Sequence, residues 1–286
     1  MRLATLRVGD RTVLAARRRD GWVDLAEVPG GAGELGALLR AAPDFAALQA
    51  AVDAAPAALL VAPGASCAAP IATGAKILCL GLNFVDHASE ASYATPEYPV
   101  VFSRYPASFV GHDQPLELPA ASSKFDFEAE LVVVIGRHGR RVAREAALTH
   151  VAGYTLMNDG SVRDFQKRTP QWLMGKNFDR SGSLGPDIVT ADELPPGARD
   201  LALSGRLNGK VMQQANTSDM LFDVATTIAY ISIAMALEPG DLIAMGTPAG
   251  VGHARKPPVF MTAGDTFEIE VERIGTLRNS VRPEAT

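Results

Sequence analysis

The sequence predicts a strand-rich α+β fold for this chain of 286 residues. Three observations support that prediction. Many short runs carry the β-branched and aromatic residues of strands, helical runs are few, and the two kinds do not alternate as in a parallel βαβ sheet. No GxGxxG motif follows a predicted strand, and the stretch GTPAGVG at 246–252 lacks the GK[ST] of a phosphate-binding loop. Dinucleotide-binding and P-loop folds are therefore not expected.

Composition narrows the class of protein further. Hydrophobic residues make up 47% and charged residues 21%, as in globular proteins, and the net charge is −5 without a basic block, so no nucleic-acid partner is expected. The apolar stretch 224–237 is shorter than the ~20 residues that span a bilayer, and the first residues carry charges where a signal peptide is apolar. Cys67 and Cys79 lack metal-site spacing and are expected to be reduced thiols of a cytoplasmic protein without a membrane partner.

The N-terminal part predicts a small domain of its own. Residues 1–30 contain short strand-like runs separated by Gly-Asp and Arg-Asp-Gly turns, and residues 34–60 are rich in Ala and Leu at helical spacing. The Pro/Gly/Ala-rich loop 61–76 predicts a boundary near residue 72. We therefore expect a small domain at 1–72 and a larger one at 73–286.

The larger part predicts mostly strands. It begins with the apolar strand KILCLGLNF, and a short helix is expected in VDHASEAS. A buried helix fits 219–237, and residues 241–246 predict a strand that ends in the glycine-rich loop. Further strands are predicted at 100–105, 125–136, 151–159, 202–212 and 266–275.

The stretch FDFEAELVVVIG at 125–136 contains the first chemical signal. Glu128 and Glu130 are two residues apart, so on a strand both project to one face. The following run, Val132 to Ile135, is apolar on both faces, which is typical of a buried strand. Like charges that close raise each other's pKa unless a cation lies between them. On this pattern alone, an exposed strand face and a divalent-metal site both remain open.

A third carboxylate and several donors follow along the chain. Asp159 lies in an Asn-Asp-Gly turn at the end of the predicted strand 151–159, where sites are commonly built, although this motif alone favours a simple turn. Arg163, Gln166 and Lys176 follow, and their side chains suit an anionic, oxygen-rich substrate.

Taken together, the motifs resemble those of the fumarylacetoacetate hydrolase family. They follow one another in a single order from about residue 73 to the C-terminus, and residues 1–72 resemble the variable N-terminal domain of bacterial members. The resemblance implies a strand-rich mixed β-roll with a small N-terminal α+β domain, assembled as a homodimer. The motifs are ILCLGLNFVDHASE, FDFEAELVVVIG, GYTLMNDGSVRDFQ, MGKNFDRSGSLGP, LNGKVMQQANTSDMLF and LEPGDLIAMGTPAGVG.

The resemblance implies that Glu128, Glu130 and Asp159 bind one Mg²⁺ or Mn²⁺ ion. Three carboxylates without His or Cys suit Mg²⁺, Mn²⁺ or Ca²⁺ rather than Zn²⁺. Three protein ligands leave positions open on an octahedral ion, and an α-keto acid could fill two of them with its carboxylate and keto oxygens. The metal would then act as a Lewis acid.

The resemblance also implies catalytic roles for His87, Glu90 and Lys176. His87 and Glu90 are three residues apart, which places them on one face of a helix. They are either an incidental surface pair or, as in the acylpyruvase branch of the family, a base that activates water. Lys176 matches the lysine that contacts the substrate or a developing oxyanion.

Three further residues match substrate-side positions of the family, namely Arg163, Gln166 and Thr247. Thr247 could equally be a turn residue fixed between a glycine and a proline. Trp172 lies between Asp159 and Lys176 and either lines the pocket or belongs to the core. The remaining histidines lie outside the motifs and are assigned no role: His112, His138, His150 and His253.

The chain departs from the family at two positions near the expected pocket. Arg104 stands where the family often has the lysine of a Lys-Pro pair, and arginine keeps the charge but not the shape. Gly160 stands where many members carry an apolar residue, and the loop RTPQWLMGKNF is specific to this chain. Because these departures lie near the expected pocket, they leave the identity of the substrate open, but not the metal site.

The function implied by the resemblance is metal-dependent hydrolysis of a C–C bond in an acylpyruvate, such as fumarylpyruvate, in the catabolism of aromatic compounds. His87 with Glu90 would activate the water that attacks the distal carbonyl. The same site could decarboxylate oxaloacetate, isomerise or decarboxylate a 2-hydroxy-diene-dioate, or hydrolyse a diketo deoxy-sugar acid, because a fold does not separate these reactions. A non-catalytic binding protein and a structural metal site are alternatives from other classes, and the presence of His87 and Lys176 disfavours the first.

Overall fold

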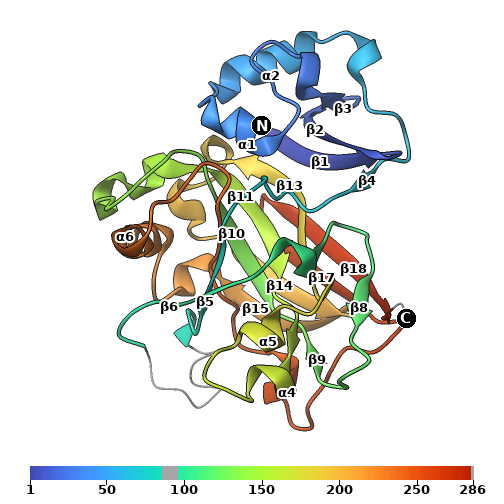
Figure 1. Cartoon of the computed structure of the whole chain (residues 1–286), viewed down its shortest axis with the longest axis vertical. Helices are drawn as coiled ribbons and strands as arrows, with labels where there is room; N and C mark the ends of the chain where they lie inside the picture. Colours follow the sequence, from blue (N-terminus) through green and yellow to red (C-terminus); the bar gives the residue numbers. More distant parts are fainter. Residues whose placement is uncertain (86–95, 285–286) are drawn as a thin grey trace.

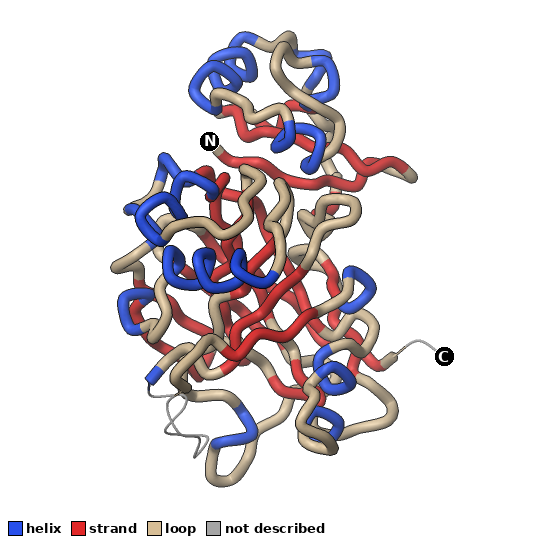
Figure 2. Tube along the Cα trace, turned by 60° about the vertical axis from the view of Figure 1, so that its left-hand side comes forward, coloured by secondary structure: helices blue, strands red, loops and turns tan. Residues whose placement is uncertain are grey.

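The computed structural model describes residues 1–85 and 96–284. A small N-terminal unit lies above a larger body made mainly of strands, and Figure 2 shows these strands running through the middle of the body. The strand-rich α+β prediction is confirmed. None of the described helices is both long and apolar enough to cross a membrane.

The N-terminal unit consists of an antiparallel meander covered by two helices (Figure 1). Its strands are β1 (Arg2–Val8), β2 (Arg11–Arg18) and β3 (Gly21–Asp24), and its helices are α1 (Leu35–Arg40) and α2 (Phe45–Ala54). The helices begin at acidic caps, because the side chain of the residue before each one accepts a backbone N–H of the first turn.

The larger sheet continues from this unit into the body. In the described part of the chain it has 11 strands, in the order β3-β2-β1-β13-β11-β10-β16-β5-β6, with β4 beside β1 and β7 beside β13. Because β1 pairs directly with β13, the sheet passes through the boundary that the sequence predicts near residue 72, and that division remains a prediction. The other strands are β4 (Ser66–Cys67), β5 (Ile77–Gly81), β6 (Val100–Ser103), β7 (Phe109–Val110), β10 (Ala129–Ile135), β11 (Val151–Asn158), β13 (Gly182–Thr190) and β16 (Leu242–Ala244).

A second sheet packs against the larger one, in the order β15-β14-β17-β18-β8. Apolar residues of β10 and β11 meet those of β14, β17 and β18 in the main core, where Phe127 stacks on Phe267 with ring centroids 4.7 Å apart. The strands of this sheet are β8 (Leu116–Leu118), β14 (Ala202–Leu207), β15 (Lys210–Asn216), β17 (Thr266–Val271) and β18 (Gly275–Pro283); β9 (Phe125–Asp126) and β12 (Ser161–Val162) form a separate pair. In the described part of the body, the α-helices are α4 (Arg163–Gln166), α5 (Leu173–Lys176) and α6 (Val224–Ala234).

The stretch 125–136 is divided between two strands rather than forming one. β9 ends at Asp126, and β10 begins at Ala129. Side chains satisfy the backbone at the break: the Glu128 N–H donates to Asn158 Oδ1 at 3.0 Å, and the Ala129 N–H donates to Gln213 Oε1 at 3.0 Å. All seven residues of β10 are buried, as the apolar run predicts. The break lets Glu128 and Glu130 lie next to the end of β11.

Two predicted elements differ from those in the structure. The helix predicted at 219–237 is shorter, because Thr217–Asp219 form a 3₁₀ turn with a capping box and α6 begins only after the cap Asp223. It is also only partly buried, since Ile233 is 62% exposed. The strand predicted at 202–212 is a hairpin of β14 and β15, because Asn208 and Gly209 adopt positive φ in its turn. Cys67 and Cys79 are free thiols, as expected.

A candidate metal-dependent active site

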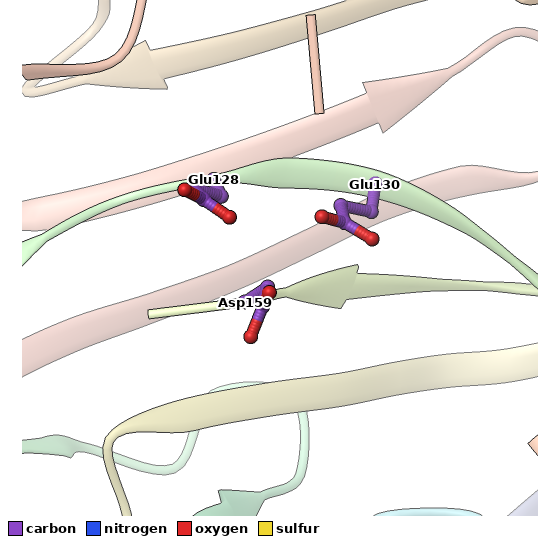
Figure 3. Close-up of side chains that lie close together, drawn as sticks. All are labelled: Glu128, Glu130 and Asp159. Atoms are coloured by element: carbon purple, nitrogen blue, oxygen red, sulfur yellow. The ribbon is translucent and has the colours of Figure 1, made fainter. Parts of the chain in front are cut away.

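Three buried carboxylates meet at the end of β11. Glu128 lies just before β10, Glu130 lies within it, and Asp159 follows the last residue of β11. The pairing of Ala129 with Asn158 and the hydrogen bond from the Asp159 N–H to the Glu128 carbonyl, 2.9 Å, hold these segments together. One oxygen from each carboxylate lies within 4.8 Å of the other two, and Figure 3 shows the two glutamates on one segment facing Asp159. The triad that the resemblance implies is therefore brought together.

Two of the three carboxylates are compensated by buried cations. Lys176 Nζ lies 2.7 Å from Glu128 Oε2 and 2.5 Å from Asp159 Oδ2. Arg163 lies 2.7 Å from Glu128 Oε1, and Arg104 lies 2.7 Å from Asp159 Oδ1. These side chains are almost completely buried, so their charges interact with little screening by solvent.

Glu130 differs from its two neighbours. Among the described residues it has no cation in contact, and it accepts a hydrogen bond from the Gly246 N–H at 3.0 Å. Its burial, followed by the charges of Asp159 and Glu128, raises the pKa of Glu130 well above its usual value. The charge of Lys176 and the Gly246 N–H only partly offset these causes. A buried carboxylate next to two others and without a cation in contact fits a site where a divalent cation takes the place of the proton.

The balance of charge around the triad points the same way. Among the described residues, four carboxylates and three cations meet here, which leaves one negative charge when all are ionised. Oxygen ligands alone suit Mg²⁺ or Mn²⁺ rather than Zn²⁺. The carboxylates are Asp126, Glu128, Glu130 and Asp159, and the cations are Arg104, Arg163 and Lys176.

Lys176 is held in its charged form. Burial on its own would lower the pKa of Lys176, but the charges of Asp159 and Glu128 outweigh burial and raise that pKa. The side chain therefore acts in this site as a hydrogen-bond donor and positive charge, and not as a base.

Asp126 anchors the arginine beside the triad. The Asp126 carboxylate accepts hydrogen bonds from Arg163 Nε at 2.7 Å, from the Gly252 N–H at 2.8 Å and from the His253 N–H at 2.9 Å. His253 Nδ1 lies 3.3 Å from the same carboxylate. Burial alone would raise the pKa of Asp126, but Arg163 and the hydrogen bonds from His253 lower it. Arg163 also donates to Gln166 Oε1 at 2.9 Å, so most of its donors serve the protein itself. Its direct contact with substrate, like that of Gln166, remains a prediction.

Thr247 is fixed between two parts of the body. Its hydroxyl donates to the Ala129 carbonyl at 3.1 Å and accepts Gln213 Nε2 at 2.7 Å. Thr247 is buried but lines the pocket beside the triad. Its contact with a substrate therefore also remains a prediction.

A pocket with an empty volume of about 510 Å³ opens above the triad. Glu128, Glu130 and Lys176 form its polar end, and Phe102 and Trp172 form an apolar wall in which the two rings meet edge to face at 5.4 Å. A side chain at position 81 would collide with the Trp172 ring, because a Cβ there would lie 2.3 Å from it. Trp172 thus belongs to the pocket wall.

Some functional candidates fall elsewhere. His87 and Glu90 lie outside the described residues, so their roles remain predictions. Asp126, Arg104 and His253 were not assigned to the site from the sequence. Asp126 could have been found, because it is two residues before Glu128 in the same alternating stretch. The family resemblance places Arg104 near the pocket without giving it a role, and nothing in the local sequence indicates His253.

Residues 76–282 match the model of a family described as fumarylacetoacetate (FAA) hydrolase C-terminal. The chain belongs to the fumarylacetoacetate hydrolase family. It is 42% identical over 215 residues to a mitochondrial oxaloacetate tautomerase, fahd2, of Xenopus laevis, covering 74% of this chain and 67% of that protein. The family contains enzymes with different reactions, as the solved structures also illustrate.

Several solved structures resemble the whole chain, and two of them illustrate this range of reactions. A fumarylacetoacetate hydrolase from Exiguobacterium antarcticum is 34% identical with a TM-score of 0.85, covering 99% of this chain and 100% of the other. A maleylpyruvate hydrolase from Sphingobium sp. SYK-6 is 30% identical with a TM-score of 0.80, again covering 99% and 100%. An acidic triad able to hold a divalent ion is consistent with membership of this family.

We expect Glu130→Gln to abolish tight binding of Mn²⁺ while leaving the fold intact. The amide has the shape of the protonated acid that the raised pKa of Glu130 favours, but it carries no negative charge for the ion. Calorimetric titration should give an affinity at least ~100-fold weaker than that of the wild type, because loss of a ligand should cost no less than the ~10- to 100-fold that loss of a residue behind a ligand costs. Glu268→Gln, on the second sheet, is the matched control and should bind Mn²⁺ as the wild type does.

The same variant tests the charge of Glu130 without a metal. Folding raises the pKa of Glu130, so the folded protein favours the protonated side chain. Protonated Glu130 therefore contributes fully to the free energy of unfolding below the pKa of the unfolded chain, about 4.5, and this contribution is lost as pH rises toward the pKa of the folded protein. In metal-free protein, the free energy of unfolding of Glu130→Gln should therefore gain on that of the wild type as pH rises from 4.5. A difference between the two that does not change with pH would contradict the account.

Proposed function

We propose that this chain is a divalent-metal-dependent enzyme that stabilises the enolate of a 2-oxo acid. One observation supports this most directly: the charged Nζ of Lys176 contacts two carboxylates of the triad, while the third, Glu130, has no cation in contact among the described residues. When bound by Glu128, Glu130 and Asp159, the divalent ion would supply Lewis acidity to the keto and carboxylate oxygens of the substrate.

The residues of the chain would stabilise and enclose the enolate. Lys176 would place a fixed positive charge where negative charge develops on the substrate oxygen. The amide nitrogen of Gln166 would donate to the carboxylate, because its oxygen is already occupied by Arg163. Phe102 and Trp172 would exclude water from one side of the pocket, which strengthens these electrostatic contacts.

The charges favour a substrate with two negative groups. Lys167 also lines the pocket. With Lys167 added to the three cations around the triad, the site has four described cations and four described carboxylates. A divalent ion would therefore leave two positive charges, which a dicarboxylate neutralises. His253 lines the same pocket and adds a ring N–H or nitrogen on that wall. We propose a 2-oxo dicarboxylic acid, with enol–keto conversion of oxaloacetate as the first reaction to test, supported by the name of the Xenopus relative.

Hydrolysis of an acylpyruvate, the reaction implied by the sequence, is the second candidate. The maleylpyruvate hydrolase that resembles the whole chain supports it. Both reactions pass through an enolate of a 2-oxo acid, so the same described residues serve either. They differ in whether water must be activated, a role that we propose for His87 with Glu90. The homodimer and the cytoplasmic location also remain predictions.

A panel of substrates tests the proposal. The enol form of oxaloacetate, maleylpyruvate, fumarylpyruvate and acetylpyruvate would be assayed with Mn²⁺, with Mg²⁺ and after treatment with EDTA. We expect metal-dependent turnover of at least one dicarboxylate, measured by loss of the ultraviolet absorbance of the enol and by release of pyruvate. Glu130→Gln with the same metal corrects for catalysis by the free ion. No turnover of any of them by the metal-loaded wild type would contradict the proposal.

His87→Ala separates hydrolysis from reactions that need no water. If His87 with Glu90 activates water, the variant should cleave acylpyruvates at least about 10²-fold more slowly, the usual contribution of a general base. Decarboxylation of oxaloacetate should fall much less, because Lys176 still stabilises the enolate. Glu90→Gln should resemble a milder His87→Ala. Equal losses of both activities would show that His87 does not act on water.

A further inference from the structure

Arg104 is a fully buried arginine whose contacts end on the metal triad. Its side chain has no exposed surface. One terminal nitrogen donates to Asp159 Oδ1 at 2.7 Å, the other donates to Ser181 Oγ at 2.9 Å, and Nε donates to Ser108 Oγ at 3.2 Å. Longer contacts reach the carbonyls of Gly160 and Ser108, both at 3.4 Å. Every nitrogen of the guanidinium therefore has an acceptor.

The surroundings of Arg104 fit a planar guanidinium and leave no space beside it. Its central carbon lies 4.5 Å from the centre of the Phe109 ring. A Cβ at Gly182 would lie 2.7 to 2.9 Å from the guanidinium atoms, so this position on β13 accepts no side chain unless the arginine moves. A lysine here would keep the charge but could not reach three acceptors in one plane.

The contact with Asp159 determines how that carboxylate is presented. Arg104 occupies Oδ1, whereas Oδ2 lies 2.5 Å from Lys176 Nζ, which in turn contacts Glu128. Oδ2 is thus the oxygen that faces Lys176 and Glu128. Without Arg104 the Asp159 carboxylate could rotate about its terminal bond, so that either of its oxygens could face Lys176 and Glu128.

We propose that Arg104 is a positioning residue that holds Asp159 so that a single oxygen faces the divalent ion. This inference rests on the metal-dependent function proposed above. Residues behind a metal ligand orient it and commonly alter the affinity for the metal by about 10- to 100-fold. Ser108, Ser181 and Gly182 together form a space that fits the guanidinium of an arginine.

Mn²⁺ titration of folded variants tests the proposal. Arg104→Lys should bind Mn²⁺ about 10-fold more weakly than the wild type, and Arg104→Met up to about 100-fold more weakly. Gly182→Ala keeps the arginine but displaces it, so this variant should also bind Mn²⁺ more weakly than the wild type. It provides the test if Arg104→Met does not fold. Circular dichroism and gel filtration would establish that each titrated variant is folded.

A control separates positioning from general stability. Arg2 forms an ion pair with Asp187, 3.0 Å apart and away from the triad, so Arg2→Met should lower the unfolding temperature without changing Mn²⁺ affinity. One outcome is that the wild type binds Mn²⁺ while folded Arg104→Lys and Gly182→Ala have affinities within twofold of the wild-type value. That result would overturn the role of Arg104 and leave the metal site in place. If the wild type itself does not bind Mn²⁺, both proposals fail.

Discussion

Three carboxylates buried within 4.8 Å of one another form an arrangement that folding alone does not favour. Their mutual repulsion must be offset from outside the triad, and the described residues do so unevenly. Lys176, Arg104 and Arg163 compensate Glu128 and Asp159, whereas Glu130 receives a backbone N–H. The remaining negative charge is what makes a divalent ion a natural component of this site.

The fold supplies this arrangement through one irregularity. The break between β9 and β10 places Glu128 outside the ladder, and the side chains of Asn158 and Gln213 replace the missing backbone partners. Gln213 also holds Thr247, so the glycine-rich loop after β16 is fixed to the same segment. The two sheets therefore act together as a rigid support for the pocket, which is what a preorganised electrostatic site requires.

The triad has local signals, but these alone leave a metal site open. Glu128 and Glu130 share a face by strand parity and Asp159 ends a strand, and the order of motifs that resembles the family was needed to join the three. Arg104 could not be predicted in this way. Its partners, Asp159 and Ser181, lie 55 and 77 residues away in sequence, and its space depends on the missing side chain of Gly182. The start of α6 was missed for a different, local reason, because Asn216 and Asp219 form the capping box of a separate 3₁₀ turn and α6 begins only after its own cap, Asp223.

The most direct test of the account is an anomalous-diffraction map of crystals soaked with Mn²⁺. The account predicts one peak, at about 2.1 Å from one oxygen of each of Glu128, Glu130 and Asp159, the distance expected for a small hard cation. It also predicts that the peak lies on the Oδ2 side of Asp159, away from Arg104. No peak between these carboxylates at saturating Mn²⁺, in crystals that leave the pocket open, would contradict the central claim.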